Sequence, residues 1–296
     1  MKVLITGASG FIGSIISQYF IKKKFEVVCL VNKKKINLKN KKFKKINISC
    51  IKKNSYKDNI DIIIHCASKT PSNSNNSKKI FYENVNLMKI LLNFSKEKNV
   101  KSFIFLSSVS VYGKKRIKIL KENNNFNNPN SYGKSKIICE KMLNNFKNKS
   151  RKNKFSCMSI RLPGVVGLGS HGNFISETSK RIIENKKIKA SNPNSYFNNI
   201  VFVNSLSEFI LKIIKRKPKK INFINLASSQ TIRVKDVINF IHLKLKKKNK
   251  TIWKKEETNS FIINFDKAIK IGYIPLTVKE SLNNYLIELR KKKVLT

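Results

Sequence analysis

A tyrosine and a lysine four residues apart are the first residues in this chain whose spacing could do chemistry. Tyr132 and Lys136 lie in the segment SYGKSK, and the pair Ser107-Ser108 ends an apolar run upstream of them. Residues four apart on a helix share a face. A phenol has a pKa of about 10, and a nearby ammonium lowers it by favouring the phenolate. The spacing predicts Tyr132 as a general acid/base, with Ser108 holding the reacting hydroxyl or carbonyl beside it. An ordinary pair on a helix surface is the alternative.

A glycine-rich turn between a strand and a helix begins the chain. Residues 1–13 read MKVLITGASGFIG, and apolar residues continue at helical spacing to about residue 23. Gly7, Gly10 and Gly13 would let the backbone approach a ligand, and the helix N-terminus would direct N–H groups and its positive dipole end at a pyrophosphate. The spacing is one residue longer than G-x-G-x-x-G. We predict a dinucleotide-binding turn, with an ordinary strand–helix turn as the alternative.

The residues after the second predicted strand bear on the choice between NAD and NADP. Phe25–Val31 is followed by Asn32, Lys33 and two further lysines, where the adenosine ribose would lie. An acidic residue there would accept from the 2′-hydroxyl of NAD, whereas a cation suits the 2′-phosphate of NADP. Because lysine is abundant throughout the chain, the segment favours NADP only slightly and leaves NAD open.

The charge of the chain raises a different alternative. Its 296 residues carry a net charge of +47, while the hydrophobic content of 41% is that of a globular protein. A nucleic-acid-binding protein would show such a charge. The lysines are scattered in short runs, however, and lysine, asparagine, isoleucine and phenylalanine are enriched together, as an A/T-rich coding sequence would produce. We therefore expect no specific nucleic-acid partner, although the positive field would attract an anionic nucleotide substrate.

The cysteines and histidines predict no metal site. The five cysteines form no C-x-x-C pair, Cys29 and Cys66 lie in apolar strand-like runs, and the three histidines share no ligand spacing. Core thiols are therefore expected. No leader precedes the first strand, and no apolar run approaches the roughly 18 residues that a membrane span needs. We expect a cytoplasmic protein that does not bind membranes.

Strands and helices alternate along most of the chain. Further strands are expected at 43–48, 60–65, 100–107, 155–161, 200–203 and 223–226, and helices at 77–98, 131–149, 174–185, 205–216, 234–245 and 279–292. The alternation predicts an α/β fold with a Rossmann-type, doubly wound parallel sheet. A proline and four glycines between Pro163 and Gly172 predict a loop. We therefore expect an NAD(P)-binding Rossmann domain at 1–160 and a smaller C-terminal α/β substrate-binding lobe at 161–296.

Seven motifs together resemble one family, the extended short-chain dehydrogenases/reductases of the NAD-dependent epimerase/dehydratase group. They are TGASGFIG (6–13), IDIIIHCAS (60–68), ENVNLMKILL (83–92), FIFLSSVSVYG (103–113), SYGKSK (131–136), RLPGVVGLG (161–169) and IGYIPL (271–276). The resemblance covers nearly the whole chain. It implies a nicotinamide-dependent enzyme that acts on a nucleotide sugar by hydride transfer, with a tyrosine acid/base, in a family that often forms homodimers.

The resemblance also assigns roles to single residues. Catalysis falls on Ser108, Tyr132 and Lys136, and the lysine also binds the nicotinamide ribose. Cofactor contacts fall on Gly7, Gly10, Phe11, Ile12, Gly13, Asn32, Lys33, Asn47, Cys66, Ala67, Ser68, Asn84, Ser107, Tyr132 and Lys136. Asn173 and Phe174 resemble the segment that meets the nucleotide diphosphate.

Departures from the family pattern narrow the expected reaction. The family's 4,6-dehydratases carry Asp-Glu directly after the catalytic Thr, whereas Val109-Ser110 follows Ser108 here, so dehydration is disfavoured. An asparagine and an arginine that usually help to hold the substrate lack clear counterparts, which leaves Arg161, Arg233 or the abundant lysines as its anchors. We expect an epimerase, with an NADPH-dependent ketoreductase as the alternative and a non-catalytic cofactor- or nucleic-acid-binding protein less favoured.

Overall fold

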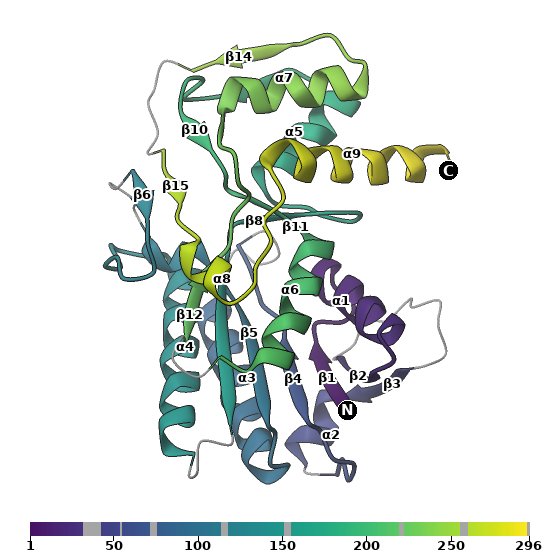
Figure 1. Ribbon diagram of the computed structural model, residues 1–296, viewed down its shortest axis with the longest axis vertical. Helices are drawn as coiled ribbons and strands as arrows, with labels where there is room; N and C mark the ends of the chain where they lie inside the picture. The colour runs from purple at the N-terminus through teal and green to yellow at the C-terminus, as the bar shows by residue number, and fades with distance from the viewer. Residues whose placement is uncertain are drawn as a thin grey trace.

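The chain folds around one parallel sheet with helices on both faces and a smaller group of elements above it (Figure 1). The computed structural model describes residues 1–31, 43–53, 55–71, 76–113, 118–150, 155–218, 222–254 and 260–294. The seven strands lie in the order β12-β7-β5-β4-β1-β2-β3, and all neighbours are parallel. Their bounds are β1 Lys2–Thr6, β2 Glu26–Val31, β3 Phe43–Asn47, β4 Ile62–His65, β5 Ser102–Ser108, β7 Ser156–Leu162 and β12 Phe223–Asn225. The predicted Rossmann-type α/β fold is confirmed.

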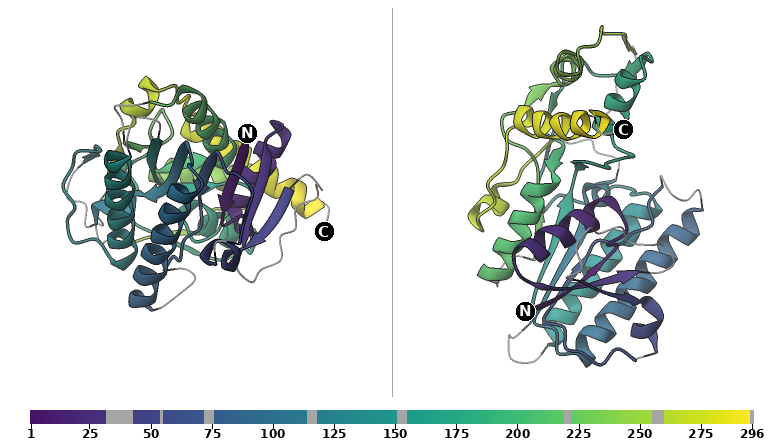
Figure 2. Two further views of the ribbon diagram at one scale, coloured as in Figure 1. Left: turned by 90° about the horizontal axis from the view of Figure 1, so that it is seen from below. Right: turned by 90° about the vertical axis from the view of Figure 1, so that its right-hand side faces the viewer.

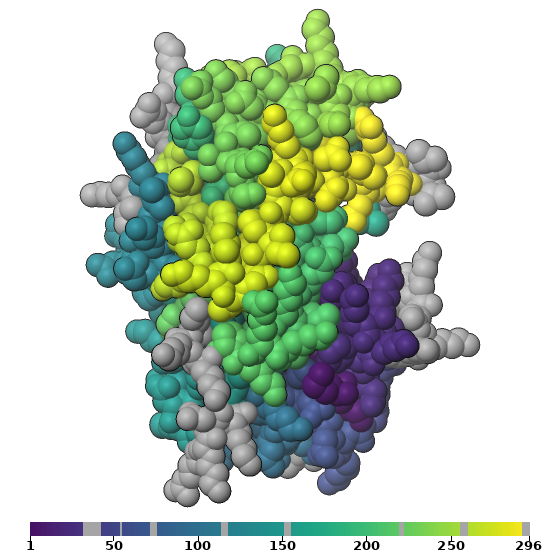
Figure 3. Space-filling model, viewed as in Figure 1, coloured from purple at the N-terminus to yellow at the C-terminus, as the bar shows by residue number. Residues whose placement is uncertain are grey.

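Burial on both faces explains why the strands are almost continuously apolar. Along β1, Val3 and Ile5 face one core, and Leu4 between them faces the other. Helices α1 (Phe11–Lys22) and α6 (Val203–Arg216) cover the first face, where they lie side by side in Figures 2 and 3. Helices α2 (Ile48–Lys52), α3 (Ser77–Glu97) and α4 (Ser131–Lys149) cover the other face.

The strand order reverses between β1 and β4. From β1 the chain proceeds to β2 and β3 in one direction, whereas β4 is followed by β5, β7 and β12 in the other. Ligands of open α/β sheets bind at such a switch point, outside the carboxyl ends of the strands. In Figure 1 these ends face the upper group of elements. A ligand is therefore expected near the segments that follow Thr6, His65 and Ser108.

The upper group has its own apolar core. It contains helices α5 (Phe174–Ile183), α7 (Val234–Leu245) and α9 (Val278–Val294). Three two-stranded pairs accompany them: β8 (Gly164–Val166) with β11 (Ile200–Phe202), β9 (Ile188–Ala190) with β14 (Thr251–Trp253), and β10 (Tyr196–Phe197) with β13 (Ile232–Arg233). Strands β6 (Ile119–Leu120) and β15 (Ile262–Ile263) pair at the side, near α8 (Asp266–Lys270).

Several local predictions need correction. The expected loop at 163–172 contains strand β8, because Gly164–Val166 pairs with β11. Helices α2 and α8 and most of the short strands were not predicted. The chain after residue 160 also returns to the sheet, through β12 beside β7 and α6 beside α1. We therefore keep the division into domains at 160/161 as a proposal in which β12 and α6 belong to the first domain.

All five cysteines are free thiols. Cys29, Cys139 and Cys157 are buried, and burial raises the pKa of each thiol to about 11. Cys66 is only partly buried. The described residues contain no helix long and apolar enough to cross a membrane, and no group of three potential metal ligands occurs among them.

Candidate functional site

The turn after β1 requires glycine at two of its positions. Gly7 has φ +70°, and a Cβ there would lie 2.8 Å from the backbone of Ala67, which follows β4. A Cβ on Gly13 would lie 2.3 Å from the carbonyl oxygen of Gly7. Gly10 closes the turn by donating its N–H to the same oxygen at 2.9 Å. The three glycines thus allow β1, α1 and the end of β4 to meet at the switch point.

The N-terminus of α1 is left without a side-chain cap. Gly10 occupies the N-cap position in an extended conformation, and the first turn carries no acidic residue. The first N–H groups of a helix have no partner within it, so those of Phe11, Ile12 and Gly13 are available to an anion. The Phe11 ring lies close to Gly167 and Gly169 of the loop after β8. This turn therefore lies between the sheet and the upper group of elements.

A threonine and a histidine hold the segment after β4 against the glycine turn. Ala67 donates its N–H to Thr6 Oγ1 at 3.0 Å, and the same hydroxyl lies 2.7 Å from His65 Nδ1. Burial and the charge of Lys136 lower the pKa of His65 to about 3. The imidazole is thus neutral at physiological pH. Sequence reasoning missed both side chains.

Asn84 joins the same segment to the helix that carries the tyrosine. Its Oδ1 accepts from Lys69 N at 2.8 Å and from Ser68 Oγ at 3.2 Å. Its Nδ2 donates to the Lys69 carbonyl oxygen and to Ser135 Oγ, both at 3.0 Å. Ser135 lies on α4 and donates to the Tyr132 carbonyl oxygen at 2.7 Å. The Asn84 side chain therefore positions the protein segments of the site.

Lys136 and Tyr132 lie together on α4. Lys136 is only 3% exposed, and its Nζ donates to the Leu106 carbonyl oxygen on β5 at 2.8 Å. The same nitrogen lies 4.7 Å from the centre of the Phe105 ring and 5.5 Å from that of the Tyr132 ring. The Lys136 side chain therefore lies between β5 and the ring of Tyr132.

Ser108 ends β5 beside the first turn of α4. Its Oγ accepts from Ser110 N at 3.1 Å and donates to Ser110 Oγ at 3.1 Å, which starts the 3₁₀ turn η1 (Val109–Tyr112). A Cβ on Gly133 would lie 2.3 Å from the Ser110 carbonyl oxygen. The glycine after Tyr132 thus lets α4 approach the turn that Ser108 begins. The structure brings the three predicted catalytic residues to one place.

The remaining predicted cofactor residues have varied surroundings. Asn47 ends β3 and caps α2 by accepting from Ser49 N at 2.9 Å. The hydroxyl of Ser107 is buried and donates to Glu140 Oε1 at 2.6 Å. Asn32 and Lys33 lie outside the described residues.

Arg161 does not have the surroundings of a substrate anchor. It is buried, and its Nε and Nη2 donate to the two oxygens of Glu140 at 3.0 and 2.8 Å. Its Nη1 donates to the Tyr112 hydroxyl at 2.9 Å and the Glu122 carbonyl oxygen at 3.0 Å. Because the guanidinium is buried and its hydrogen bonds to the described residues all go to internal groups, we withdraw Arg161 as a substrate ligand.

The other predicted substrate residues lie in the upper group of elements. Asn173 caps α5 by accepting from Ser176 N at 3.0 Å and also donates to the Val165 carbonyl oxygen at 3.1 Å. Phe174 is 39% exposed, and its ring centre lies 5.8 Å from that of Phe197. Arg233 is exposed at the start of α7.

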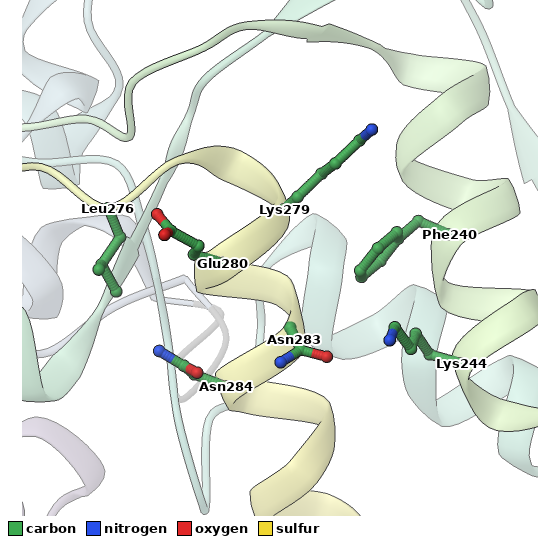
Figure 4. A pocket seen from close by; sticks show the side chains of 7 residues that line it. All are labelled: Phe240, Lys244, Leu276, Lys279, Glu280, Asn283 and Asn284. Atoms are coloured by element: carbon green, nitrogen blue, oxygen red, sulfur yellow. The ribbon is translucent and has the colours of Figure 1, made fainter.

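A groove of about 380 Å³ lies elsewhere, between α7 and α9 (Figure 4). It is lined by Phe240, Lys244, Leu276, Lys279, Glu280, Asn283 and Asn284. None of the predicted site residues lines it, so the groove is separate from the Tyr132 site.

The glycine turn at the switch point, together with Tyr132 and Lys136 on α4 beside it, defines a Rossmann-like nucleotide-binding protein. A family model described as the NAD dependent epimerase/dehydratase family matches residues 3–251. The chain therefore belongs to this family, and the resemblance seen in its motifs is confirmed.

Two curated relatives match part of the chain. A dTDP-D-glucose 4,6-dehydratase from Dictyostelium discoideum is 35% identical over 147 residues, which are 44% of this chain and 34% of the relative. The uncharacterized UDP-glucose epimerase YtcB from Bacillus subtilis (strain 168) is 31% identical over 137 residues, 40% of this chain and 43% of the relative. The matches thus span less than half of either relative.

Solved structures resemble the fold over nearly its whole length. A UDP-glucose 4-epimerase from Thermotoga maritima, with UDP-glucose, has a TM-score of 0.84 at 18% identity, covering 99% of this chain and 100% of the other. MoeE5 in complex with UDP-glucose and NAD has a TM-score of 0.83 at 18% identity, with the same coverage. At this identity the likeness establishes the shared fold.

Proposed function

We propose that this protein is an NAD(P)-dependent epimerase that acts on a nucleotide-activated sugar by reversible hydride transfer. One observation carries the proposal. The ring of Tyr132 lies against the buried ammonium of Lys136, beside Ser108 and at the same edge of the sheet as the glycine turn. A passive binding protein would not need this arrangement of acid, base and cation.

The residues at the switch point fit a dinucleotide. The glycine turn brings the backbone close to the ligand position, and the uncapped N-terminus of α1 offers N–H donors to a pyrophosphate. Lys136, whose Nζ donates to the Leu106 carbonyl oxygen on β5, supplies a buried cation on the other side of the switch point from α1. When bound, the nicotinamide supplies a hydride acceptor that can return the hydride to the sugar.

The chain's own residues move the proton. Tyr132 takes the proton from the sugar hydroxyl that becomes a carbonyl, and returns it when the carbonyl is reduced. Lys136 stabilises the phenolate through its charge, and Ser108 donates a hydrogen bond to the reacting oxygen. Neither proton transfer needs an acid or base other than Tyr132, Lys136 and Ser108.

The substrate class rests on the upper group of elements and on the relatives. Both curated relatives are named for a nucleotide-linked glucose. Asn173, Phe174 and the exposed Arg233 are proposed to meet the nucleotide diphosphate, and the net charge of +47 would favour such an anion. Val109 and Ser110 after Ser108 favour epimerisation over loss of water, because neither side chain can act as the extra acid and base of a dehydratase.

An NADPH-dependent ketoreductase of a nucleotide sugar or another carbonyl is the second candidate. The lysines that follow Asn32 favour it, since they suit a 2′-phosphate. The nucleotide released from freshly purified protein separates the two. Tightly held NAD or NADH supports the epimerase, whereas an empty protein that binds NADPH preferentially supports the ketoreductase.

A nucleic-acid-binding protein on the same fold is the rival from another class. It predicts a mobility shift of DNA or RNA that weakens steeply between two salt concentrations. Such a shift, combined with no turnover of any nucleotide sugar, would favour the rival over both enzymes.

A further inference from the structure

A buried carboxylate on α4 continues the line of the proposed catalytic residues. Tyr132, Lys136 and Glu140 follow one another at intervals of four, so they lie along one face of the helix. Glu140 is only 3% exposed. The proposed mechanism does not use it.

The Glu140 carboxylate ties α4 to two strands of the sheet. Its Oε1 accepts from Ser107 Oγ at 2.6 Å and from Arg161 Nε at 3.0 Å. Its Oε2 accepts from Arg161 Nη2 at 2.8 Å. Ser107 lies on β5 directly before Ser108, and Arg161 lies opposite it on β7. One side chain thus connects the helix of Tyr132 to the strand of Ser108.

Arg161 is itself fixed from its other side. Its Nη1 donates to the Tyr112 hydroxyl, which in turn donates to Asn225 Oδ1 on β12 at 2.8 Å. Burial alone would lower the pKa of Arg161, but Glu140 and Tyr112 raise it above its ordinary value. The guanidinium is therefore charged, and the position of the Glu140 carboxylate is determined by groups on β5, β7 and β12.

A buried ion pair gives little net stability compared with apolar side chains of similar volume. Its directional hydrogen bonds differ from apolar contacts, because they do not tolerate rotation or sliding of the helix. The face of α4 that Glu140 fixes is the one that presents Lys136 to Leu106 and Tyr132 to the reacting atoms. A small rotation of α4 would therefore move both catalytic groups away from Ser108.

We propose that Glu140 is a positioning residue, whose carboxylate, held by Ser107 and Arg161, sets the placement of Tyr132 and Lys136 against Ser108. This inference rests on the proposed function, since the placement matters for proton transfer at Tyr132. Misplacement of a reacting group by about 1 Å can cost about a hundredfold in rate.

The test uses Glu140→Asp, which keeps the charge but withdraws the carboxylate by one methylene. We expect kcat to fall about 10- to 100-fold, with KM and cofactor affinity changed less than about threefold. Glu97→Asp, the same change at an exposed position at the end of α3, should leave kcat unchanged. If kcat of Glu140→Asp falls by no more than its fraction of folded protein falls, the proposal is overturned.

A double variant separates positioning from stability. Glu140→Met with Arg161→Met replaces the ion pair by apolar side chains, which should restore much of the resistance to urea that either single variant loses. The proposal predicts that kcat is not restored. Recovery of both stability and kcat would show that the pair has a purely structural role.

A structural measurement keeps this inference separate from the proposed function. The crystal structure of Glu140→Asp needs no substrate and no turnover. Lys136 Nζ, which lies 2.8 Å from the Leu106 carbonyl oxygen and 5.5 Å from the centre of the Tyr132 ring, should move relative to both groups. Unchanged positions of Tyr132 and Lys136 contradict the positioning role, whereas displaced side chains in a protein without turnover support it and reject only the proposed reaction.

Discussion

The ammonium nitrogen of Lys136 lies 5.5 Å from the centre of the Tyr132 ring and 2.8 Å from the carbonyl oxygen of Leu106. Because Lys136 is 3% exposed, its charge is screened far less by water than a surface lysine's would be. The carbonyl oxygen accepts a hydrogen bond from the ammonium and holds it beside the phenol ring. These two side chains form the unit on which the proposed reaction depends.

Removal of the Tyr132 hydroxyl should abolish turnover while the cofactor still binds. Tyr132→Phe keeps the ring above Lys136 but has no proton to give or accept, so kcat should fall about 10²- to 10⁴-fold. Titration of NADH fluorescence should give an affinity close to that of the wild type. The matched control is Tyr82→Phe, on a ring that is 69% exposed on α3. Activity retained in Tyr132→Phe would rule out this mechanism.

The glycine turn should respond to alanine according to the space at each position. A Cβ at Gly13 would lie 2.3 Å from the Gly7 carbonyl oxygen, whereas one at Gly10 would lie 3.3 Å from it. Gly13→Ala should therefore lower the free energy of unfolding by about 1–3 kcal/mol and weaken cofactor binding. Gly10→Ala should have the smaller effect in both assays. Helix propensity alone predicts that Gly13→Ala stabilises α1, so a more stable variant would contradict the packing argument.

The two arginines predicted as substrate anchors should behave in opposite ways. Arg161→Met leaves the buried Glu140 charge unpaired and should lower the free energy of unfolding by about 3–5 kcal/mol. Arg233→Met, at an exposed position, should change stability by less than about 0.5 kcal/mol. If Arg233 meets the diphosphate, its loss should raise KM for the nucleotide sugar about tenfold or more. Urea unfolding and steady-state kinetics measure the two effects. An unchanged KM would remove Arg233 from the substrate site.

Stability should fall in mild acid because His65 resists protonation in the fold. The unfolded chain protonates this imidazole near its ordinary pKa of about 6.5, whereas burial and Lys136 lower the folded pKa to about 3. Between these values the unfolded state binds more protons, so the free energy of unfolding decreases as the pH falls, by up to about 1.4 kcal/mol for each pH unit. The pKa of His242 is also lowered by burial, so that residue contributes in the same direction.

Urea unfolding at pH 7 and pH 5 isolates the share of His65. The loss of stability between the two pH values should be about 2 kcal/mol smaller in His65→Gln than in the wild type. His171→Gln, at an exposed position, should leave the loss unchanged. An equal loss in His65→Gln and the wild type would contradict the account of the buried neutral imidazole.

The elements that carry the site were predictable because their patterns are local. Apolar runs of β-branched residues gave β1 and β4, and the helical spacing of apolar residues gave α4 and α7 with the observed bounds. The glycine turn followed from residue types that suit close backbone approach. These signals lie within a few residues of one another, so they need no knowledge of the fold.

The role of Arg161 was not predictable, because it depends on partners far along the chain. Glu140 is 21 residues away and Tyr112 is 49 residues away. Only the pairing of β5 with β7 and the packing of α4 on the sheet bring them together. The return of β12 to the sheet after α6 is likewise a tertiary event. The strand at 223–226 was expected, but its pairing with β7 depends on residues much earlier in the chain.

The most direct test of the proposed function is to incubate the protein with NAD and, separately, UDP-glucose, UDP-N-acetylglucosamine and dTDP-glucose. Proton NMR would follow the configuration at C4, and absorbance would follow reduced cofactor. The account predicts that the C4 epimer of at least one sugar accumulates to equilibrium with no net reduction of NAD, and that Tyr132→Phe forms none. No epimer from any of the three, or equal rates in wild type and Tyr132→Phe, would contradict it.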